Sequence, residues 1–369
     1  MNSQRIQNLQ TKLDTLDVGA FIITNTENIY YYTGFKGISE KGREAMVVVP
    51  KVGKVTLIVP RMYELQAQNL NSVQNNTISI EVLDKSESFI NKLSKIVSSI
   101  SKFLMEEYDL NIEEYNKLKE KLEGEFIKSD KLLYKLRSIK DTEEMKLIKK
   151  AVWLTDLTFE KIVDFLQTND YTKFTEIDIA EKIRSISFEL GGEGLSFRPI
   201  VACTKASAQP HYLPRSQKLQ KNSILLIDLG VKYKGYGGDL TRTLFLGRAD
   251  KEVKSTFKYV LHCNEKCIDL CKSGVKFSSI QKKAVEYFGK YGLEEYFIHS
   301  IGHGLGLDEH EFPFPGGIDD ELREGMVFTI EPGLYFPDKY GIRIEDVLII
   351  SKNGVEVISN QTKQILLEI

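Results

Sequence analysis

The chain has 369 residues, of which 42% are hydrophobic, and its 50 basic and 52 acidic residues give a formal net charge of −2. This length accommodates two domains with separate cores. Balanced, well-mixed charge gives no reason to expect a nucleic acid or a membrane surface as a partner. The polar N-terminus and the lack of a run of about 18 apolar residues predict a cytoplasmic protein, whose ligands would be small molecules or peptides.

The first 130 residues alternate between helix and strand patterns. Leucine and isoleucine recur with helical spacing over residues 6–16, which predicts an opening helix. Short apolar runs bounded by turn residues predict strands, and two longer stretches beyond them predict helices. The strands are expected at 18–24, in a hairpin over 45–60 and at 78–83, and the helices over roughly 85–103 and 111–122. We therefore predict an α/β domain over residues 1–130.

A highly charged stretch, SDKLLYKLRSIKDTEE, spans residues 129–144 and opens a long helix, so we place the domain boundary near residue 130. Helical and strand patterns are mixed beyond it. Helices are expected near 141–167, 176–190, 250–272 and 277–290, and strands at 197–203, 224–230, 241–247, 325–333 and 341–350. Residues 131–369 are thus predicted to form an α+β domain in which the strands gather behind helices.

The cysteines number only four, far below the density of a disulfide scaffold. Cys263, Cys267 and Cys271 recur every four residues and so share one face of a predicted helix, together with Ile268. Reduced cysteines commonly serve as small core residues. We therefore assign these cysteines to the core and not to a metal or redox site.

Charged residues interrupt several predicted strands. Asp228 lies within the apolar run ILLIDLG, where an unpaired carboxylate would be costly, so it must be neutralised, paired or bound to a cation. Asp239 follows across the turn-rich GVKYKGYGG, and a hairpin would bring the two aspartates together. Glu331 interrupts MVFTIEPG, and Glu345 interrupts GIRIEDVLII.

Five histidines occur in the whole chain. His211 lies in QPHYLP, and His299, His303 and His310 lie in IHSIGHGLGLDEHEFP, whereas His262 adjoins the helical cysteines and is given no chemistry. The HSIGH spacing equals that of a zincin, but the glutamate is missing and a glycine stands where a helix is needed. Neither GHGLGL nor GYGGDL has the strand–loop–helix setting of a nucleotide-phosphate loop.

Four carboxylates and the histidines together indicate a metal site. A charge of about −4 would be neutralised by two divalent cations, and one neutral imidazole would complete their ligands. Oxygen-rich sites with one histidine favour Mn²⁺, although Co²⁺, Fe²⁺ and Zn²⁺ could occupy them too. Two ions roughly 3.5 to 4 Å apart would hold a bridging hydroxide as a nucleophile near neutral pH, which predicts a hydrolase.

These segments, in their order and spacing, resemble the pita-bread metallopeptidases, above all Xaa-Pro aminopeptidases and Xaa-Pro dipeptidases (prolidases). The matching motifs are IDLGVKYKGYGGDLTRT, SIGHGLGLDEHEFP, MVFTIEPGLY and GIRIEDV. NIYYYTGF in the first domain resembles the creatinase-like N-terminal domain of the same enzymes. The resemblance implies a C-terminal pita-bread (creatinase/aminopeptidase) domain preceded by a smaller α/β creatinase-like domain.

Residue by residue, the resemblance implies that Asp228, Asp239, His303, Glu331 and Glu345 bind two metal ions, with Asp239 and Glu345 bridging both. It further implies that the bridging hydroxide attacks the scissile carbonyl and that Glu331 handles the proton. His211 and His310 match substrate-contacting histidines, Arg343 a supporting arginine, and His299 a further supporting histidine.

The resemblance also implies a homodimer and, as substrate, a peptide with proline at the second position. Some prolidase-like relatives place an arginine after HE-x-P that could bind a substrate carboxylate, whereas this chain has Phe314 in HEFPF. This difference favours an Xaa-Pro aminopeptidase that acts on longer peptides. Arg43, from the first domain, could instead supply the charge and make the chain a dipeptidase.

Two further hypotheses stay open from the sequence. One is a non-catalytic binding protein with the pita-bread fold, although such proteins commonly lose metal ligands and none is missing here. The other is a hydrolase of different amides, because a fold and a metal site leave the substrate pocket undefined.

Overall fold

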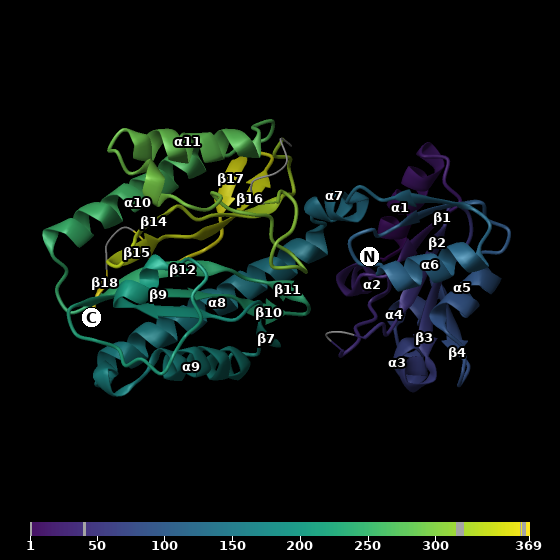
Figure 1. The fold of residues 1–369 in the computed structure, drawn as a ribbon, viewed down its shortest axis with the longest axis horizontal. Coiled ribbons are helices and arrows are strands. Elements are labelled where there is room, and N and C mark those ends of the chain that lie inside the picture. Colours follow the sequence, from purple (N-terminus) through teal and green to yellow (C-terminus); the bar gives the residue numbers. More distant parts are fainter. Residues whose placement is uncertain (1, 40–41, 315–320, 362, 364–366) are drawn as a thin grey trace. The chain divides into compact units, whose positions relative to one another are not determined.

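A computed structural model describes residues 2–39, 42–314, 321–361, 363 and 367–369 (Figure 1). The chain divides into two compact units, residues 1–133 (unit 1) and 134–369 (unit 2). Within the described part of the chain, every helix is too short or too polar to span a bilayer.

Unit 1 is built on one six-stranded sheet with the order β4-β3-β2-β1-β5-β6. Strand β2 pairs antiparallel with β1 and β3, and the remaining pairs are parallel. The strands are β1 Ala20–Ile23, β2 Met46–Pro50, β3 Val55–Pro60, β4 Ile78–Leu83, β5 Lys102–Met105 and β6 Glu125–Lys128.

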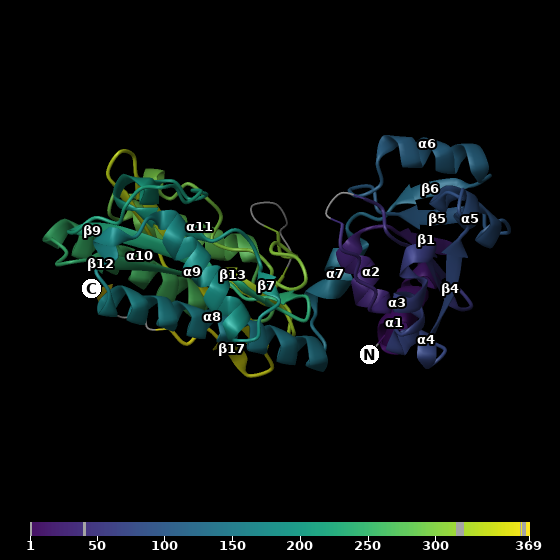
Figure 2. The same ribbon diagram turned by 90° about the horizontal axis from the view of Figure 1, so that it is seen from below.

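Helices cover this sheet on both sides, and Figure 2 shows α6 on the opposite side of the strands from α1. The helices are α1 Asn2–Thr15, α2 Thr26–Thr33, α3 Glu64–Gln68, α4 Asn71–Gln74, α5 Phe89–Ile96 and α6 Ile112–Lys121, with a 3₁₀ turn at Arg61–Tyr63. Alternate residues of β1 explain this arrangement, because Ala20 and Ile22 join the core under α5 and α6 while Phe21 is buried on the other face.

One predicted helix of unit 1 is wrong at its end. The expectation of a helix over 85–103 fails after Ile96, because Lys102–Met105 forms the buried strand β5 and pairs in parallel with β1. A short apolar run such as 103–105 does not distinguish a strand from a helix end, and the pairing with β1 decides between them.

The described residues of unit 2 include four long helices, and α7 Leu132–Ser138 precedes them. The long helices are α8 Thr142–Thr168, α9 Glu176–Glu189, α10 Lys251–Leu270 and α11 Phe277–Gly289, with 3₁₀ turns at Tyr171–Lys173, Thr204–Ala208 and Glu294–Tyr296. Capping boxes begin α8 and α9, where Asp141 pairs with Glu144 and Thr175 with Asp178.

Where the structure describes unit 2, its strands form four small sheets with the orders β18-β12-β9-β8, β11-β10-β7, β13-β16-β17 and β14-β15. Their bounds are β7 Gly194–Leu195, β8 Ile200–Cys203, β9 Ser223–Leu229, β10 Val231–Tyr233, β11 Tyr236–Gly237, β12 Leu240–Leu246, β13 Val327–Ile330, β14 Gly333–Phe336, β15 Tyr340–Arg343, β16 Asp346–Ser351, β17 Gly354–Val357 and β18 Leu367–Glu368.

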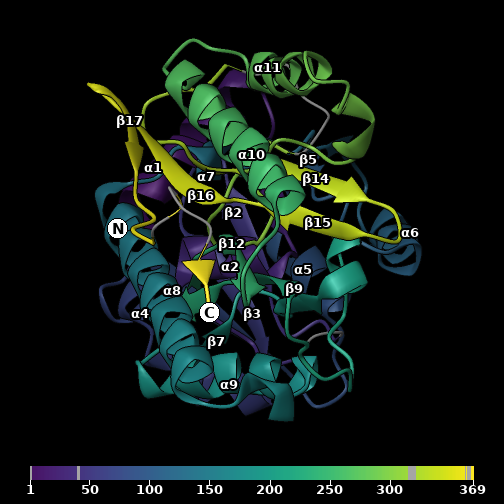
Figure 3. The same cartoon turned by 90° about the vertical axis from the view of Figure 1, so that its left-hand side faces the viewer.

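Two helix pairs enclose these strands. Helices α8 and α9 pack on one side, against β8, β9 and β12, and α10 and α11 pack on the other, against β13 to β16 (Figures 1 and 3). Cys263, Cys267 and Cys271 are free and buried in the core under α10, as predicted. The α+β architecture of the second part of the chain is confirmed.

Candidate active site

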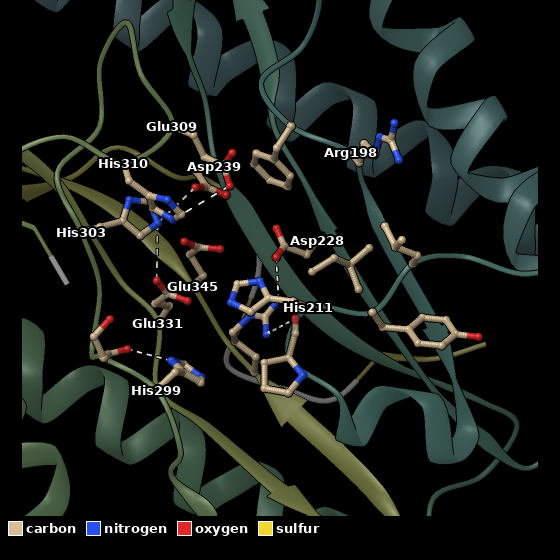
Figure 4. A pocket seen from close by; sticks show the side chains of 17 residues that line it. Arg198, His211, Asp228, Asp239, His299, His303, Glu309, His310, Glu331 and Glu345 are labelled. Atoms are coloured by element: carbon tan, nitrogen blue, oxygen red, sulfur yellow. Dashed lines mark hydrogen bonds and ion pairs between the residues drawn. The ribbon is translucent and has the colours of Figure 1, made fainter. Parts of the chain in front are cut away.

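Unit 2 contains a cavity of about 370 Å³ (Figure 4). Every residue that the sequence indicated for metal binding or catalysis lines it: His211, Asp228, Asp239, His299, His303, His310, Glu331, Arg343 and Glu345. These side chains come from segments spread over more than a hundred residues, and the fold brings them to one place.

Asp228 and Asp239 lie at the same end of one antiparallel strand pair. Asp228 faces Thr241 in the register of β9 with β12, and Asp239 immediately precedes β12. Along β9, Leu225, Ile227 and Leu229 face the core under α8 and α9. Because strand side chains alternate, Asp228 points to the opposite face, towards the cavity. The predicted hairpin relation between the two aspartates is therefore present.

Glu331 and Glu345 have the same relation to a second strand pair. Ile330 at the end of β13 faces Asp346 at the start of β16. Glu331 directly follows the first of these residues, and Glu345 directly precedes the second. Both glutamates were expected inside continuous strands, but each lies at a break, between β13 and β14 and between β15 and β16.

A glycine-flanked loop holds His303 against β13. The loop pairs with this strand through hydrogen bonds from the Thr329 amide to the His303 carbonyl (2.8 Å) and from the Glu331 amide to the Ile301 carbonyl (2.8 Å). A Cβ added at Gly302 would lie 2.0 Å from the Thr329 carbonyl oxygen. The close approach of the two backbones therefore requires glycine beside His303.

The imidazole of His303 presents a lone pair to the carboxylates. Its Nδ1 lies 3.1 Å from the carbonyl oxygen of Gly304, which can only accept a hydrogen bond. Nδ1 therefore carries the proton, and Nε2 faces Asp239 and Glu331 at 3.7 and 3.5 Å. Burial, together with His310, lowers the pKa of His303 to about 3, so the ring is neutral at pH 7.

A chain of hydrogen bonds supports the cavity from behind. The Arg343 guanidinium donates to Asp228 (2.5 Å), to the Thr241 hydroxyl (3.0 Å) and to the Tyr335 hydroxyl (2.7 Å). Tyr335 lies 2.9 Å from Nε2 of His299, whose Nδ1 lies 2.7 Å from the Ser300 carbonyl. Since that carbonyl accepts only, Tyr335 donates to His299 and accepts from Arg343. Arg343 and His299 thus orient other groups of the site.

The charges of the cavity need a cation. Burial, and then the neighbouring carboxylates, raise the pKa of Asp239 and of Glu345 well above their usual values. Burial also raises the pKa of Glu331 to about 8, although Arg343 opposes the shift. Oδ1 of Asp228 is buried and has no hydrogen-bond partner among the described residues. Burying a polar atom without a hydrogen bond lowers the stability of the folded state, unless a ligand binds that atom.

The donor set fits divalent metal ions. Ligand atoms of Asp239, His303 and Glu345 all lie within 4.8 Å of one another, and all three residues are buried. Carboxylate oxygens and one neutral imidazole suit divalent ions such as Mn²⁺, Co²⁺, Fe²⁺ or Zn²⁺. Cations here would also remove the repulsion that raises the pKa values of these carboxyl groups.

His310 and His211 lie nearer the solvent than the carboxylates. The His310 ring is edge-on to that of His303, with 4.2 Å between centroids, and its side chain is 45% exposed. His211 is exposed. Glu309 also lines the cavity, and burial, followed by the charge of Asp228, raises its pKa. The sequence offered a signal for Glu309, because it directly precedes His310 in the same motif.

A buried ion-pair network fixes the loop that carries His310. The guanidinium of Arg137, at the end of α7, contacts Glu311 and lies 2.8 Å from Asp308, and Lys140 Nζ lies 2.5 Å from Glu311. Glu311 also accepts the Leu307 amide at 2.8 Å. Burial raises the pKa of Glu311, but Arg137 and Lys140 outweigh it and hold the pKa at about 2.

Glu311→Gln is expected to lower the free energy of unfolding by about 3 kcal/mol at pH 7, because two buried cations lose their carboxylate. The folded-state pKa lies below the unfolded one, so this contribution is complete above the unfolded pKa and is lost as the pH falls towards 2. Urea unfolding of wild type and variant at pH 7 and pH 3 measures this contribution to the free energy of unfolding. Glu143→Gln is the control, because the Glu143 side chain is exposed. An equal difference at both pH values would contradict this account.

Two positions were considered for an arginine that could bind the substrate carboxylate: Arg43, and the position after HE-x-P, where this chain has Phe314. In unit 1, Arg43 Nη1 lies 2.6 Å from Asp109 and Nη2 lies 2.7 Å from Glu114, and Nη1 also donates to the Thr24 carbonyl. Its hydrogen bonds are therefore used within unit 1. Phe314 packs edge-on against Tyr134, with 5.1 Å between ring centroids.

Four carboxylates and one imidazole form a cage, which consists of Asp228, Asp239, His303, Glu331 and Glu345. Such a cage, on an α+β unit that follows an α/β unit in the chain, is typical of metal-dependent hydrolases. Comparison with known proteins gives the family. Residues 146–352 match the model of metallopeptidase family M24, and residues 5–139 match that of the creatinase/prolidase N-terminal domain. The chain belongs to metallopeptidase family M24. The predictions of a pita-bread fold and of a metallo-exopeptidase are thereby confirmed.

Relatives cover nearly the whole chain. A Xaa-Pro dipeptidase of Pyrococcus horikoshii is 30% identical over 367 residues, or 99% of each chain. The solved structure of a Xaa-Pro dipeptidase from Bacillus anthracis matches with a TM-score of 0.90 at 29% identity and covers 100% of both chains. That of an X-Pro aminopeptidase from Thermotoga maritima matches with a TM-score of 0.83 at 28% identity, over 96% of this chain and 99% of that one.

Proposed function

We propose that this protein is a metal-dependent Xaa-Pro peptidase, which hydrolyses the bond between an N-terminal residue and a following proline. The observation that carries the proposal is the convergence of four carboxylates and the lone pair of His303 on one cavity. The names of the relatives, among them Xaa-Pro dipeptidases and an X-Pro aminopeptidase, support the proline specificity.

We assign Asp239 and Glu345 to both metal ions, Asp228 to one ion, and His303 with Glu331 to the other. Divalent ions held by these residues would supply a nucleophile near neutral pH, because a bound cation lowers the pKa of water. Glu331, whose carboxylate lies 3.5 Å from Nε2 of His303, is suited to accept and return a proton. His211 and His310, at the solvent side, would bind the substrate and donate to the carbonyl oxygen as its charge develops.

Two forms of the activity differ in the length of the peptide. The sequence favoured an aminopeptidase, and the likeness to the Thermotoga maritima X-Pro aminopeptidase supports that form. The dipeptidase form has the stronger support, because the Xaa-Pro dipeptidase from Bacillus anthracis matches with the higher TM-score and Pyrococcus horikoshii contributes a second relative of that name. We therefore propose a dipeptidase and keep the aminopeptidase as the second candidate.

The purified protein loaded with Mn²⁺ is expected to cleave Ala-Pro with a kcat/KM at least about 10-fold above that for Ala-Pro-Ala, a difference of about 1.4 kcal/mol. The reason is that a dipeptidase recognises the free carboxylate next to the scissile bond. Release of alanine from both peptides, followed with and without a chelator, measures the ratio. Faster cleavage of the tripeptide would support the aminopeptidase. Cleavage of neither would contradict the proposed function and favour a non-catalytic binding protein.

We also keep Mn²⁺ as the expected ion, together with a homodimer and a cytoplasmic location. These remain predictions from the sequence. Metal analysis of the protein as purified, and its mass in solution, would test the first two.

A further inference from the structure

Arg198 lines the cavity on a side where the sequence indicated no functional residue. It lies between β7 and β8, and its side chain is exposed. Figure 4 shows it across the pocket from His303 and Glu331. The register of β8 with β9 sets its position, because Ile200 faces Asp228 and Arg198 precedes Ile200 by two residues.

The guanidinium of Arg198 makes no hydrogen bond or ion pair within the described part of the chain. Arg343, the other arginine that lines the cavity, differs in this respect. Its three nitrogens donate to Asp228, Thr241 and Tyr335, and it is buried. Arg198 is therefore the lining arginine whose five donors are available to a ligand.

The surroundings of Arg198 suit the end of a short peptide. Phe197, Ile200 and Leu213 line the cavity with it and offer apolar surface for a proline ring. The opposite side holds the carboxylates Asp239, Glu331 and Glu345, which the proposed function assigns to the metal ions and hence to the scissile bond. A free C-terminus lies beyond the scissile bond, and Arg198 is on the side of the cavity away from these carboxylates.

We infer that Arg198 binds the C-terminal carboxylate of an Xaa-Pro dipeptide and so determines the length of the substrate. The inference rests on the proposed function, which it deepens by naming the residue that would favour dipeptides. A guanidinium can hold a carboxylate through two parallel hydrogen bonds, whereas the internal amide of a longer peptide offers no such partner.

The dimensions agree with this role. In a dipeptide the carboxylate lies one residue, about 3.5 Å, beyond the scissile carbonyl. Arg198 precedes by two residues the strand residue Ile200 that faces Asp228, a separation of at most about 7 Å along the chain. The flexible arginine side chain covers the remaining distance. Neither Arg43, which is paired in unit 1, nor Phe314, which lacks charge, is needed for it.

The experiment compares Ala-Pro, its C-terminal amide Ala-Pro-NH₂ and Ala-Pro-Ala as substrates of the Mn²⁺-loaded protein. Wild type is expected to have a lower KM for the acid than for the amide. Arg198→Gln should raise the KM for Ala-Pro by about 10- to 100-fold and leave kcat and the KM for the amide nearly unchanged, since only the charged contact is lost. Arg198→Lys should fall between the two, because lysine keeps the charge without the planar fork.

Arg215→Gln is the matched control, because this exposed arginine lies on the same chain segment as His211 but does not line the cavity. It should leave all three KM values unchanged. Equal loss of acid and amide hydrolysis in Arg198→Gln would overturn the inference, as would a wild type that does not distinguish acid from amide. If wild type hydrolysed none of the peptides, the proposed function would fail. Calorimetric binding of Ala-Pro to wild type and Arg198→Gln would then still decide the role of Arg198.

Discussion

Asp239→Asn is expected to lower kcat/KM for Xaa-Pro hydrolysis by at least about 1,000-fold and to remove bound metal at the same time. Loss of a metal that stabilises the transition state by several kcal/mol corresponds to a rate loss of this size. Asp239 is placed to have this effect because its carboxylate is buried among Glu345, Asp228 and Glu331 and lies 3.7 Å from His303.

Metal content by mass spectrometry and kcat/KM on Ala-Pro, measured on the same preparations, test this expectation. Asp338→Asn is a suitable control, because Asp338 is exposed and its φ of 59° is a conformation that asparagine also adopts readily. Thermal unfolding would verify that each variant is folded. An Asp239→Asn protein that kept its metal and its activity would refute the assignment of this residue.

His310→Ala is expected to lower kcat by about 100-fold while most of the metal stays bound. The loss is that of a single donor to the developing oxyanion. The ring of His310 contacts His303 edge-on, and the nearest carboxylate to its Nε2 is that of Glu309 at 3.9 Å, on the neighbouring residue. Burial, then His211, lower its pKa, so the neutral ring retains one N–H at pH 7.

The comparison with Asp239→Asn makes this test informative. The two variants should separate turnover from metal content, since one residue belongs to the cage and the other to its solvent side. Equal metal loss in both variants would show that His310 is a ligand, and the roles assigned above would then be wrong.

In the sequence, the four carboxylates of the cavity were indicated as charged residues that break apolar strand patterns. Asp228 stands in β9, where all the remaining residues are buried too. A carboxylate in such a run is informative without any knowledge of the partner strand. The hairpin relation of Asp228 and Asp239 followed from the turn residues between them. Local rules therefore identified which side chains were unusual.

Other features depend on contacts that local patterns do not contain. The breaks at Glu331 and Glu345 arise where β14 and β15 pair with each other and leave the sheet of β13 and β16. Strand β5 is defined by its pairing with β1. Arg198 violates no pattern, because an exposed arginine before a strand is ordinary. Two structural observations identify Arg198 as a candidate: it lines the cavity, and it has no hydrogen-bond or ion-pair partner within the described residues.

The two strand pairs that carry the acidic residues have a consequence for folding as well as for catalysis. Asp228 and Asp239 come from one pair, and Glu331 and Glu345 come from another about ninety residues later in the chain. Ions held by all four carboxylates would act as cross-links between two halves of unit 2, one that contains α8 and α9 and one that contains α10 and α11. Metal binding would then close a long loop of the chain, and the energy of ligation would add to the stability of the folded state.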